Sequence, residues 1–347
     1  MQFYTKKHQY YCGIDLHTKI IYICLLNSDG KVLVHEQTKA NPEALMAVIE
    51  PCLDDLVITV ECMFTWYWVS NFCHEHKIKF VLGHALYMKA IHGGKAKNDK
   101  VDSYKIARLI HSGMLAEAYN YPEGMRATRD LLRRRLFFVR QCAQLKTHTK
   151  VLNYQYNLPP INGNLKNHST RESVLIPFDD LSAKRSAQAN IDTIAFYHQQ
   201  INSLEFFIKK NAKLDDYQSF MILKSIKGVG DVLAMTILYE IHTIQRFPTV
   251  QKFASYCRLI KCKAESAGKV YGTSGNKIGN AHLRWAFSEA AALYLRGNKK
   301  AQNYHARLVK KHGNGKAMGI LSHKLGRAVY FMLKRKEAFN ESAFLNG

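Results

Sequence analysis

The sequence predicts an N-terminal α/β domain with a mixed sheet, then a long basic helical arm and a mostly helical C-terminal domain. Three patterns carry this prediction. Short β-rich runs alternate with helical segments up to residue 112, an apolar repeat of helical spacing runs from 126 to 152, and short helical segments fill the rest. The chain of 347 residues suffices for at least two domains, and its 47% hydrophobic content excludes an intrinsically disordered chain.

The N-terminal domain is expected to contain five strands. The turn signal Asn27-Ser28-Asp29-Gly30 joins two β-rich runs into a meander, and Asn41-Pro42 is typical of a helix start. The predicted strands are 10–16, 20–26, 31–35, 56–60 and 78–82, and the predicted helices begin at 42 and span 65–76 and 99–112. This order, βββαβαβ followed by a helix, indicates a mixed five-stranded sheet within residues 1–120.

A helical arm is expected in residues 121–215. Leu132, Leu136 and Val139 recur at helical spacing, which is typical of a coiled-coil-like helix. Residues 158–190 contain Pro159-Pro160 and Pro177 and are interpreted as an irregular insertion, after which a second helix over 191–210 packs back along the first. Residues 216–347 then form the C-terminal domain.

The charge balance indicates a polyanionic partner. Fifty Lys and Arg against 27 Asp and Glu give a net charge of +23, and nucleic acid is the commonest cytoplasmic polyanion. Residues 296–336 contain twelve Lys or Arg and no acid. No apolar run is long enough for a membrane span or a signal peptide, so we expect a cytoplasmic protein that binds no membrane. The eight scattered cysteines are expected to be reduced, because none forms a Cys-x-x-Cys pair.

Four acids fall where a metal site can form. An acid in an apolar strand is unfavourable unless it is paired or metal-bound, and Asp15 and Glu61 both occupy such positions. Asp99 and Asp102 are three residues apart and share one helix face. Together they could bind Mg²⁺ or Mn²⁺, which prefer oxygen ligands, for phosphoryl transfer. Asp99 and Asp102 also have an interpretation without a metal. Acids are favourable at a helix start, and Asp102 can pair with Lys105.

Two further motifs lie in the C-terminal region. Lys227-Gly228-Val229-Gly230 separates two helical segments, and the amides at such a turn can bind a DNA phosphate without reading bases. Ser266 lies in a basic loop that contains glycine, with Ser274 as a weaker candidate nearby. Considered alone, Ser266 is best interpreted as a turn hydroxyl.

Together these motifs resemble the DEDD insertion-sequence transposases related to Piv invertase. The resemblance rests on Gly13-Ile14-Asp15, Val60-Glu61 and the run from Asn98-Asp99 to Asp102-Ser103, and in the C-terminal region on Glu265-Ser266 and the segment 279–285. It covers about 10–110 and 220–335 and implies the RNase H-like fold of RuvC resolvase for the first domain. It also implies that Ser266 is the nucleophile. Lys227 and Ala267 depart from the family, which often has Pro and Gly at these positions.

The resemblance implies site-specific recombination that moves an insertion sequence. Its expected partners are donor and target DNA, a noncoding RNA encoded by the element that guides the choice of site, and one or three further copies of the chain. The expected nucleic-acid-binding residues are Lys95, Lys97, Arg133, Arg134, Arg135, Gly228, Gly230, Lys263, Lys269 and Arg284. Two alternatives remain. One is a RuvC-like nuclease that cuts branched DNA by water attack, and the other is a nucleic-acid-binding protein without catalysis.

Overall fold

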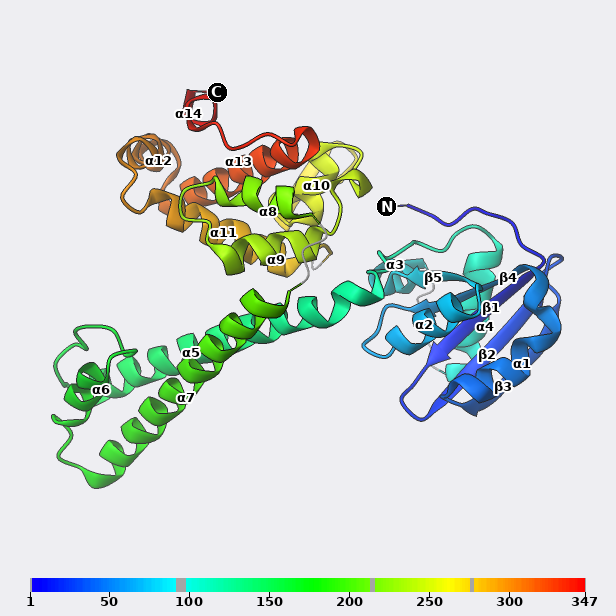
Figure 1. Cartoon of the computed structure of the whole chain (residues 1–347), viewed down its shortest axis with the longest axis horizontal. Coiled ribbons are helices and arrows are strands. Elements are labelled where there is room, and N and C mark those ends of the chain that lie inside the picture. Colours follow the sequence, from blue (N-terminus) through cyan, green and yellow to red (C-terminus); the bar gives the residue numbers. More distant parts are fainter. Residues whose placement is uncertain (1, 92–97, 213–215, 275–277, 347) are drawn as a thin grey trace. The chain divides into compact units, whose positions relative to one another are not determined.

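The computed structural model describes residues 2–91, 98–212, 216–274 and 278–346. Its contacts divide the chain into two compact units, Met1–Gly124 and Met125–Gly347 (Figure 1). We refer to them as the N-terminal and C-terminal units.

The N-terminal unit is built on the expected mixed sheet of five strands. The strands are β1 (Tyr10–Leu16), β2 (Ile20–Asn27), β3 (Val32–Lys39), β4 (Leu56–Glu61) and β5 (Lys79–Gly83). Their order across the sheet is β3-β2-β1-β4-β5. The first three strands pair antiparallel, whereas β1 with β4 and β4 with β5 pair parallel. The meander and both later strands therefore confirm the sequence prediction.

Helices cover both faces of this sheet. They are α1 (Pro42–Ile49), the 3₁₀ segment η1 (Glu50–Asp55), α2 (Tyr67–Glu75), α3 (Ala85–Ile91) and α4 (Asp99–His111). Cys12, Ile14 and Leu16 of β1 share a core with α1 and α2, while Tyr11 of the same strand packs with α4. Asn41 and Asn98 cap α1 and α4, as their positions before each helix predict. Helix α3 was not expected from the sequence.

Helix α4 lies directly on β1. A Cβ atom added to Gly13 would be only 2.2 Å from the backbone nitrogen of Ala107 and 2.7 Å from the carbonyl oxygen of Ser103. Any side chain larger than hydrogen would therefore push the helix away from the strand. At the far end of α4, the His111 ring meets the Tyr11 ring edge-on with centroids 5.0 Å apart, so the helix runs antiparallel to β1.

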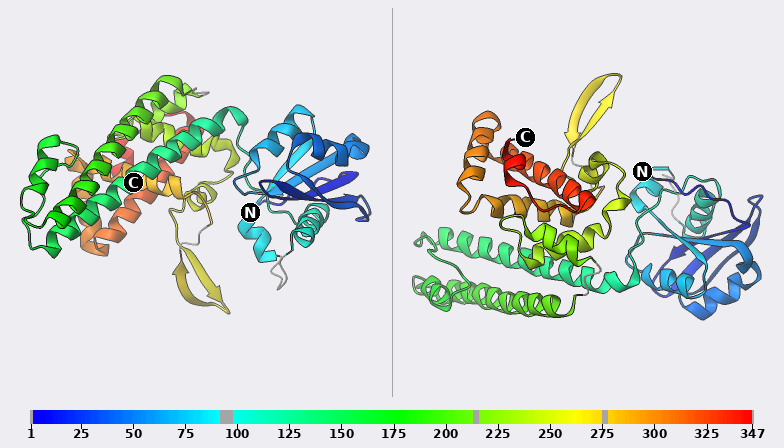
Figure 2. Two further views of the ribbon diagram at one scale, coloured as in Figure 1. Left: turned by 90° about the horizontal axis from the view of Figure 1, so that it is seen from below. Right: turned by 45° about the horizontal axis from the view of Figure 1, so that its top comes forward.

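The C-terminal unit begins with an antiparallel pair of long helices, α5 (Glu123–Gln155) and α7 (Leu181–Asn211), which lie side by side in Figures 1 and 2. We call this pair the arm. Its helices are joined by contacts such as the 2.6 Å ion pair between Arg135 and Glu205 and the 2.9 Å hydrogen bond between His148 and Asn190.

Two details of the arm differ from the sequence prediction. The expected irregular insertion 158–190 contains a helix, α6 (His168–Leu175), and α7 begins at Leu181, ten residues before the predicted start. Asp180 caps α7 by accepting a hydrogen bond from the amide of Ala183, and Ala183 packs with Phe178 and Leu152 of α5. The prolines made this segment look irregular, whereas burial of apolar side chains on α5 orders it.

The rest of the C-terminal unit is a bundle of short helices around one core. The described elements are α8 (Tyr217–Lys224), α9 (Asp231–Ile241), η2 (Ile244–Arg246), α10 (Val250–Tyr256), α11 (Ala281–Leu295), α12 (Lys299–His312), α13 (Asn314–Arg335), α14 (Glu341–Asn346) and the strands β6 (Cys262–Ser266) and β7 (Lys269–Ser274). Leu132 and Ile208 of the arm belong to the same core, so the root of the arm is part of the bundle. The C-terminal domain is mostly helical as predicted, and the β6–β7 hairpin lies where the sequence analysis expected a loop.

A buried carboxylate joins the arm to the bundle. Glu240 of α9 accepts hydrogen bonds from Arg129 at 3.1 Å, from Arg133 at 2.5 and 2.9 Å, and from the side-chain amide of Asn280 at 2.7 Å. Burial alone would raise the pKa of Glu240, but the hydrogen bonds and the two arginine charges outweigh it and lower this pKa to about 2.

The cysteines whose side chains are described are all free, as expected. Among the helices of the described ranges, none combines the length and the apolar character that a membrane crossing needs.

We expect Gly13→Ala to destabilise the N-terminal unit by about 1–3 kcal/mol, because the new methyl group overlaps the backbone of α4. The measurement is urea unfolding followed by the fluorescence of Trp66 and Trp68 in a Trp285→Phe background, which leaves tryptophan only in the N-terminal unit. Gly124→Ala is the matched control, since a Cβ there would have no neighbour within 4 Å. Equal stability of both variants would contradict the close packing of α4.

We expect Glu240→Gln to lower the stability of the C-terminal unit at neutral pH by about 3 kcal/mol. The pKa of this group is lowered from 4.5 to about 2 in the folded chain, so its contribution is complete above pH 4.5 and is lost as the pH falls toward 2. The difference between wild type and variant, measured by urea unfolding followed by circular dichroism, should therefore disappear over that range. Glu205→Gln, at a more exposed ion pair, should show a much smaller difference. A difference that stays constant with pH would contradict this role of Glu240.

Candidate active site

Polar side chains gather at the carboxyl ends of β1 and β4, on the face that α4 covers. Side chains alternate along a strand, so Asp15 points to the side of Tyr11, which packs with α4. His17 follows the end of β1, and its side chain contacts Asp15. Val57 of β4 belongs to the same core, which places Glu61 on that face as well. Because Ile14 pairs with Val60 in the parallel register, Asp15 and Glu61 follow at adjacent positions of neighbouring strands.

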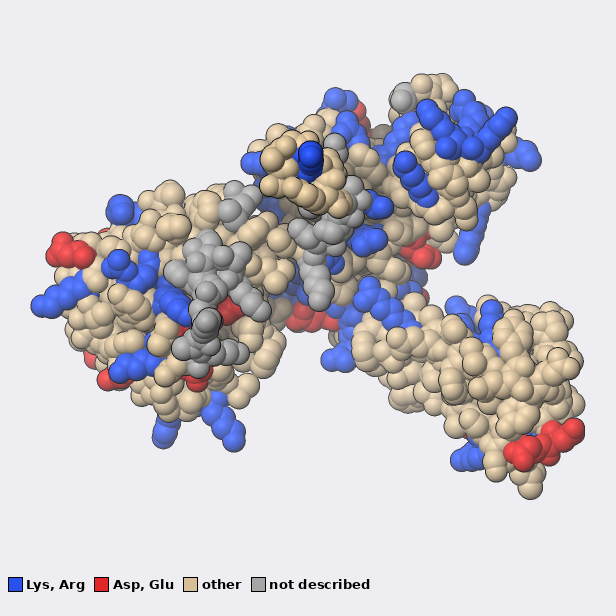
Figure 3. Space-filling model, turned by 180° about the vertical axis from the view of Figure 1, so that it is seen from behind, with Lys and Arg blue, Asp and Glu red and all other residues tan. Residues whose placement is uncertain are grey.

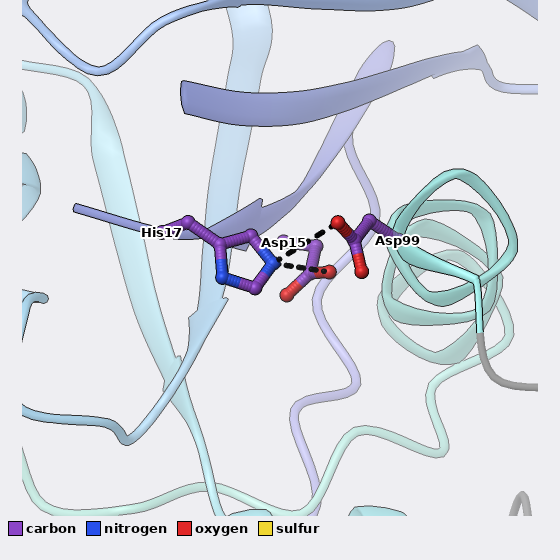
Figure 4. A group of neighbouring side chains, drawn as sticks. All are labelled: Asp15, His17 and Asp99. Carbon is purple, nitrogen blue, oxygen red and sulfur yellow. Dashed lines mark ion pairs between the residues drawn. The ribbon is translucent and has the colours of Figure 1, made fainter. Parts of the chain in front are cut away.

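The structure brings Asp15, His17 and Asp99 together (Figure 4). The Nε2 atom of His17 lies 3.3 Å from a carboxylate oxygen of Asp15 and 3.4 Å from one of Asp99. Asp99 reaches the strand because it is the first residue of α4, whose axis is fixed by the close contact at Gly13. Burial raises the pKa of Asp15, His17 lowers it, and the charges of Asp99 and Asp102 raise it further.

The other two predicted acids lie near this group but outside it. Asp102 is one turn further along α4 and forms an ion pair with Lys105 at 3.2 Å, as the structural interpretation anticipated. Glu61 is half-buried at the end of β4. The described structure thus places Asp15 and Asp99 close together. Glu61 lies on the same edge of the sheet as Asp15, and Asp102 lies on the same helix as Asp99.

His17 was missed by the sequence interpretation. The signal was present, since His17 follows Asp15 by two residues, and this spacing puts two side chains on one face of a strand.

The donor set fits a divalent cation. The carboxylates of Asp15 and Asp99 are close enough to bind one ion, and the pKa of Asp15 is raised. Two such carboxylates repel each other unless a cation lies between them. Carboxylate oxygens suit Mg²⁺ and Mn²⁺, and an imidazole nitrogen in the set favours a transition metal such as Mn²⁺ over Mg²⁺.

Ser266 lies at the tip of the β6–β7 hairpin, which projects from the helices in both views of Figure 2. It pairs with Lys269 across a two-residue turn whose central residues, Ala267 and Gly268, have φ values of 49° and 73°. Positive φ at both positions is the requirement of a type I′ hairpin turn, and it explains why glycine suits the position of Ala267. Both Ser266 and Lys269 are exposed, and the side chain of Lys263 lies outside the described part.

The Gly-x-Gly turn joins α8 to α9 as expected, but its glycines differ in role. Gly228 has a φ of 88°, and a Cβ there would lie 2.7 Å from the backbone of Leu293, so this glycine permits contact with α11. Gly230 precedes α9 and has open space around it. Asp231, in the first turn of α9, pairs with Lys224 at 2.7 Å.

The predicted nucleic-acid contacts fall into three groups. Arg133 and Arg135 bind the carboxylates of Glu240 and Glu205 within the C-terminal unit. Arg134 and Arg284 are exposed. Lys95 and Lys97 lie outside the described residues.

A larger basic surface lies along α12. Figure 3 shows Lys and Arg side chains gathered over this helix, and its exposed members, with Lys316 of α13, are Lys299, Lys300, Arg307, Lys310, Lys311 and Lys316. We call these six residues the α12 patch.

Comparison with known proteins finds similarity in two parts of the chain. A family model for DEDD transposases of the IS110 type matches residues 12–155, and a model for the transposase IS116/IS110/IS902 family matches residues 221–306. Two separate parts of the chain are thus similar to transposase domains of the IS110 type. The first contains all four acids of the sequence prediction, and the second contains Ser266. These are domains of enzymes that cut and transfer DNA strands.

A curated relative agrees with this assignment. The insertion element IS110 uncharacterized 43.6 kDa protein of Streptomyces coelicolor is 28% identical over 148 residues, which cover 42% of this chain and 35% of the relative. The chain thus matches about a third of the length of that relative.

We expect His17→Ala to weaken Mn²⁺ binding by about tenfold or more and Mg²⁺ binding by less, because the nitrogen ligand contributes more to a transition metal. Binding is measured by electron paramagnetic resonance of Mn²⁺, with Mg²⁺ as competitor. Asp15→Asn should weaken both ions, and His74→Ala, at an exposed position in the same unit, should weaken neither. Unchanged Mn²⁺ affinity in His17→Ala would exclude His17 as a ligand.

Proposed function

We propose that this protein cuts and rejoins DNA strands to move an insertion sequence. The single observation that carries the proposal is the convergence of Asp15 and Asp99, with His17, at one edge of the sheet, inside a domain of the IS110 transposase type. The net charge of +23 supports a nucleic-acid substrate.

The acidic edge is the proposed metal centre. Asp15, Asp99 and His17 would hold the cation, with Glu61 and Asp102 beside them on the same edge. A bound Mg²⁺ or Mn²⁺ supplies neutralisation of the charge that develops on a phosphate during displacement. The chain's own contribution is to fix these ligands on a strand and on a helix start, which hold them more rigidly than loops would.

Ser266 is the proposed nucleophile. Its Oγ attacks the phosphorus of a DNA phosphodiester, a phosphoserine bond forms, the bond from phosphorus to one sugar oxygen breaks, and the hydroxyl proton passes to that oxygen. A hydroxyl end of a second strand then attacks the phosphoserine, which restores the serine and joins the strands. The exposed Lys269 lies opposite Ser266 and is suited to hold the phosphate. Because the serine ester preserves the bond energy, no nucleotide cofactor is needed.

The basic surfaces are the proposed DNA and RNA contacts. Exposure supports this role for Arg134, Arg284 and the α12 patch, and open space supports it for Gly230. Contacts to phosphates would position nucleic acid without reading its sequence. Choice of site is assigned to pairing with a noncoding RNA from the element. The strand order β3-β2-β1-β4-β5 supports an RNase H-like, RuvC-related fold for the N-terminal unit. We further propose a coiled-coil role for the arm in forming a dimer or tetramer, and action in the cytoplasm.

We expect wild-type protein, incubated with its element's noncoding RNA, a labelled donor junction and Mg²⁺, to form a covalent complex with DNA that survives a denaturing gel. Ser266→Ala removes the attacking oxygen and Asp15→Asn a proposed ligand, so each should reduce the adduct by at least about a hundredfold. The matched control is Ser274→Ala, which should keep it.

The other outcomes separate the alternatives. Cleavage without an adduct, unaffected by Ser266→Ala, would identify a hydrolytic RuvC-like nuclease. Full binding with no cleavage in wild type or variants would identify a nucleic-acid-binding protein without catalysis. An adduct that forms equally well without RNA would remove the guided choice of site.

A further inference from the structure

Two large apolar side chains are exposed directly after the strand that ends at Glu61. Phe64 is 79% exposed and Met63 is 48% exposed, while Trp66 two residues later is buried at 5%. Full burial of a phenylalanine side chain stabilises a fold by about 1.5–3 kcal/mol. Because Phe64 is mostly exposed, its side chain contributes little of this stabilisation to the fold.

The turn that carries Phe64 is held on both sides. The amide of Cys62 donates to the carbonyl of Gly83 at 2.8 Å, and the amide of Met63 donates to the carbonyl of Glu61 at 2.8 Å. After the turn, the Trp66 ring stacks on Phe80 and meets Tyr67 edge-on. The exposure of Phe64 is therefore a property of an anchored turn.

The same contacts place this turn beside the candidate active site. The hydroxyl of Thr65 donates to the carbonyl of Leu16 at 3.4 Å, and Leu16 lies between Asp15 and His17 in the chain. On its other side the turn begins at Glu61, whose strand position is adjacent to that of Asp15. Phe64 is thus adjacent to Thr65, which contacts Leu16, and lies three positions after Glu61. Both neighbours tie it to the edge that carries the acids.

We propose that Phe64, with Met63 beside it, stacks on a nucleobase that is unstacked from DNA next to the phosphate held at the acidic edge. This inference rests on the proposed function, because that function brings a phosphodiester to Asp15 and Asp99. Backbone phosphates are charged and suit the basic surfaces, whereas the faces of bases are the apolar, flat part of DNA and suit an exposed ring. An apolar side chain inserted between base steps also opens the duplex locally.

The inference assigns substrate preference to this turn. A strand whose bases are already unpaired, as in a bubble or junction, does not need to be unstacked before it meets Phe64, so it binds more tightly than a continuous duplex. The basic patches make no such distinction, since phosphates are present in both.

The test uses the full chain with Ca²⁺ in place of Mg²⁺ and a synthetic duplex that contains a short unpaired bubble with 5-iododeoxyuridine. Ultraviolet irradiation links this base to a stacked aromatic ring, and mass spectrometry of peptides locates the link. We expect it at Phe64. Phe64→Leu, which keeps an apolar side chain but no ring, should lose the link and bind the bubble about 5- to 100-fold more weakly, while Phe64→Trp should retain both.

A matched control and the opposing outcomes complete the test. Phe206 of the arm is 70% exposed, so Phe206→Leu removes a ring of similar exposure and should leave the link and the affinity unchanged. The role of Phe64 would be overturned if the cross-link mapped to another residue. The proposed function would stay intact if the covalent complex of Ser266 with DNA still depended on Asp15. A link at Phe64 in a protein that also fails to cleave the same DNA when Mg²⁺ replaces Ca²⁺ would support the base contact and overturn the cutting activity. Unchanged DNA binding in Phe64→Leu together with a change of oligomeric mass would assign the ring to an interface between copies and overturn the inference.

Discussion

The contact between α4 and Gly13 determines the chemistry of the N-terminal unit. With hydrogen at this position the helix backbone reaches the strand, so Asp99, at the first turn of α4, lies within 3.4 Å of the same imidazole that contacts Asp15 on β1. Residues about eighty-five positions apart in the sequence thereby share one site. A helix carried on larger side chains would stand further from the sheet and separate these acids. The glycine in the Gly-Ile-Asp motif is therefore as necessary to the site as the acids themselves.

In the C-terminal unit a buried network of charged side chains holds the helices together, whereas in the N-terminal unit a close backbone contact does so. Glu240 is almost fully buried and joins α5, α9 and the start of α11 through Arg129, Arg133 and Asn280. A buried pair of this kind adds little net stability compared with apolar packing, but loss of one partner leaves the other charged and buried. Its effect is to attach the root of the arm to the bundle. Arg133, which sequence alone assigns to DNA because it lies in a basic run, is held by this network.

The sequence was informative wherever local chemistry decides structure. The meander, the capped helix starts and the strand-end acids were predictable because turn residues, Asn caps and acids in apolar runs each have a local physical reason. It was less informative where distant contacts decide. The start of α7 depends on packing of Ala183 against Leu152, and the pairing of β6 with β7 gives a short glycine-bearing segment its order. His17 was overlooked for a different reason, because its strand spacing from Asp15 gains meaning only once Asp99 is brought from α4.

The hairpin that carries Ser266 has a consequence for how this protein changes over evolutionary time. Its tip residues Glu265 to Gly272 are exposed, so substitutions there alter little of the packed interior and leave the folding free energy almost unchanged. The acidic edge has no such freedom, because its residues are fixed by a glycine contact and a sheet register. Folding stability thus constrains the residues around the serine far less than those of the acidic edge, so any constraint on the hairpin comes from its chemistry.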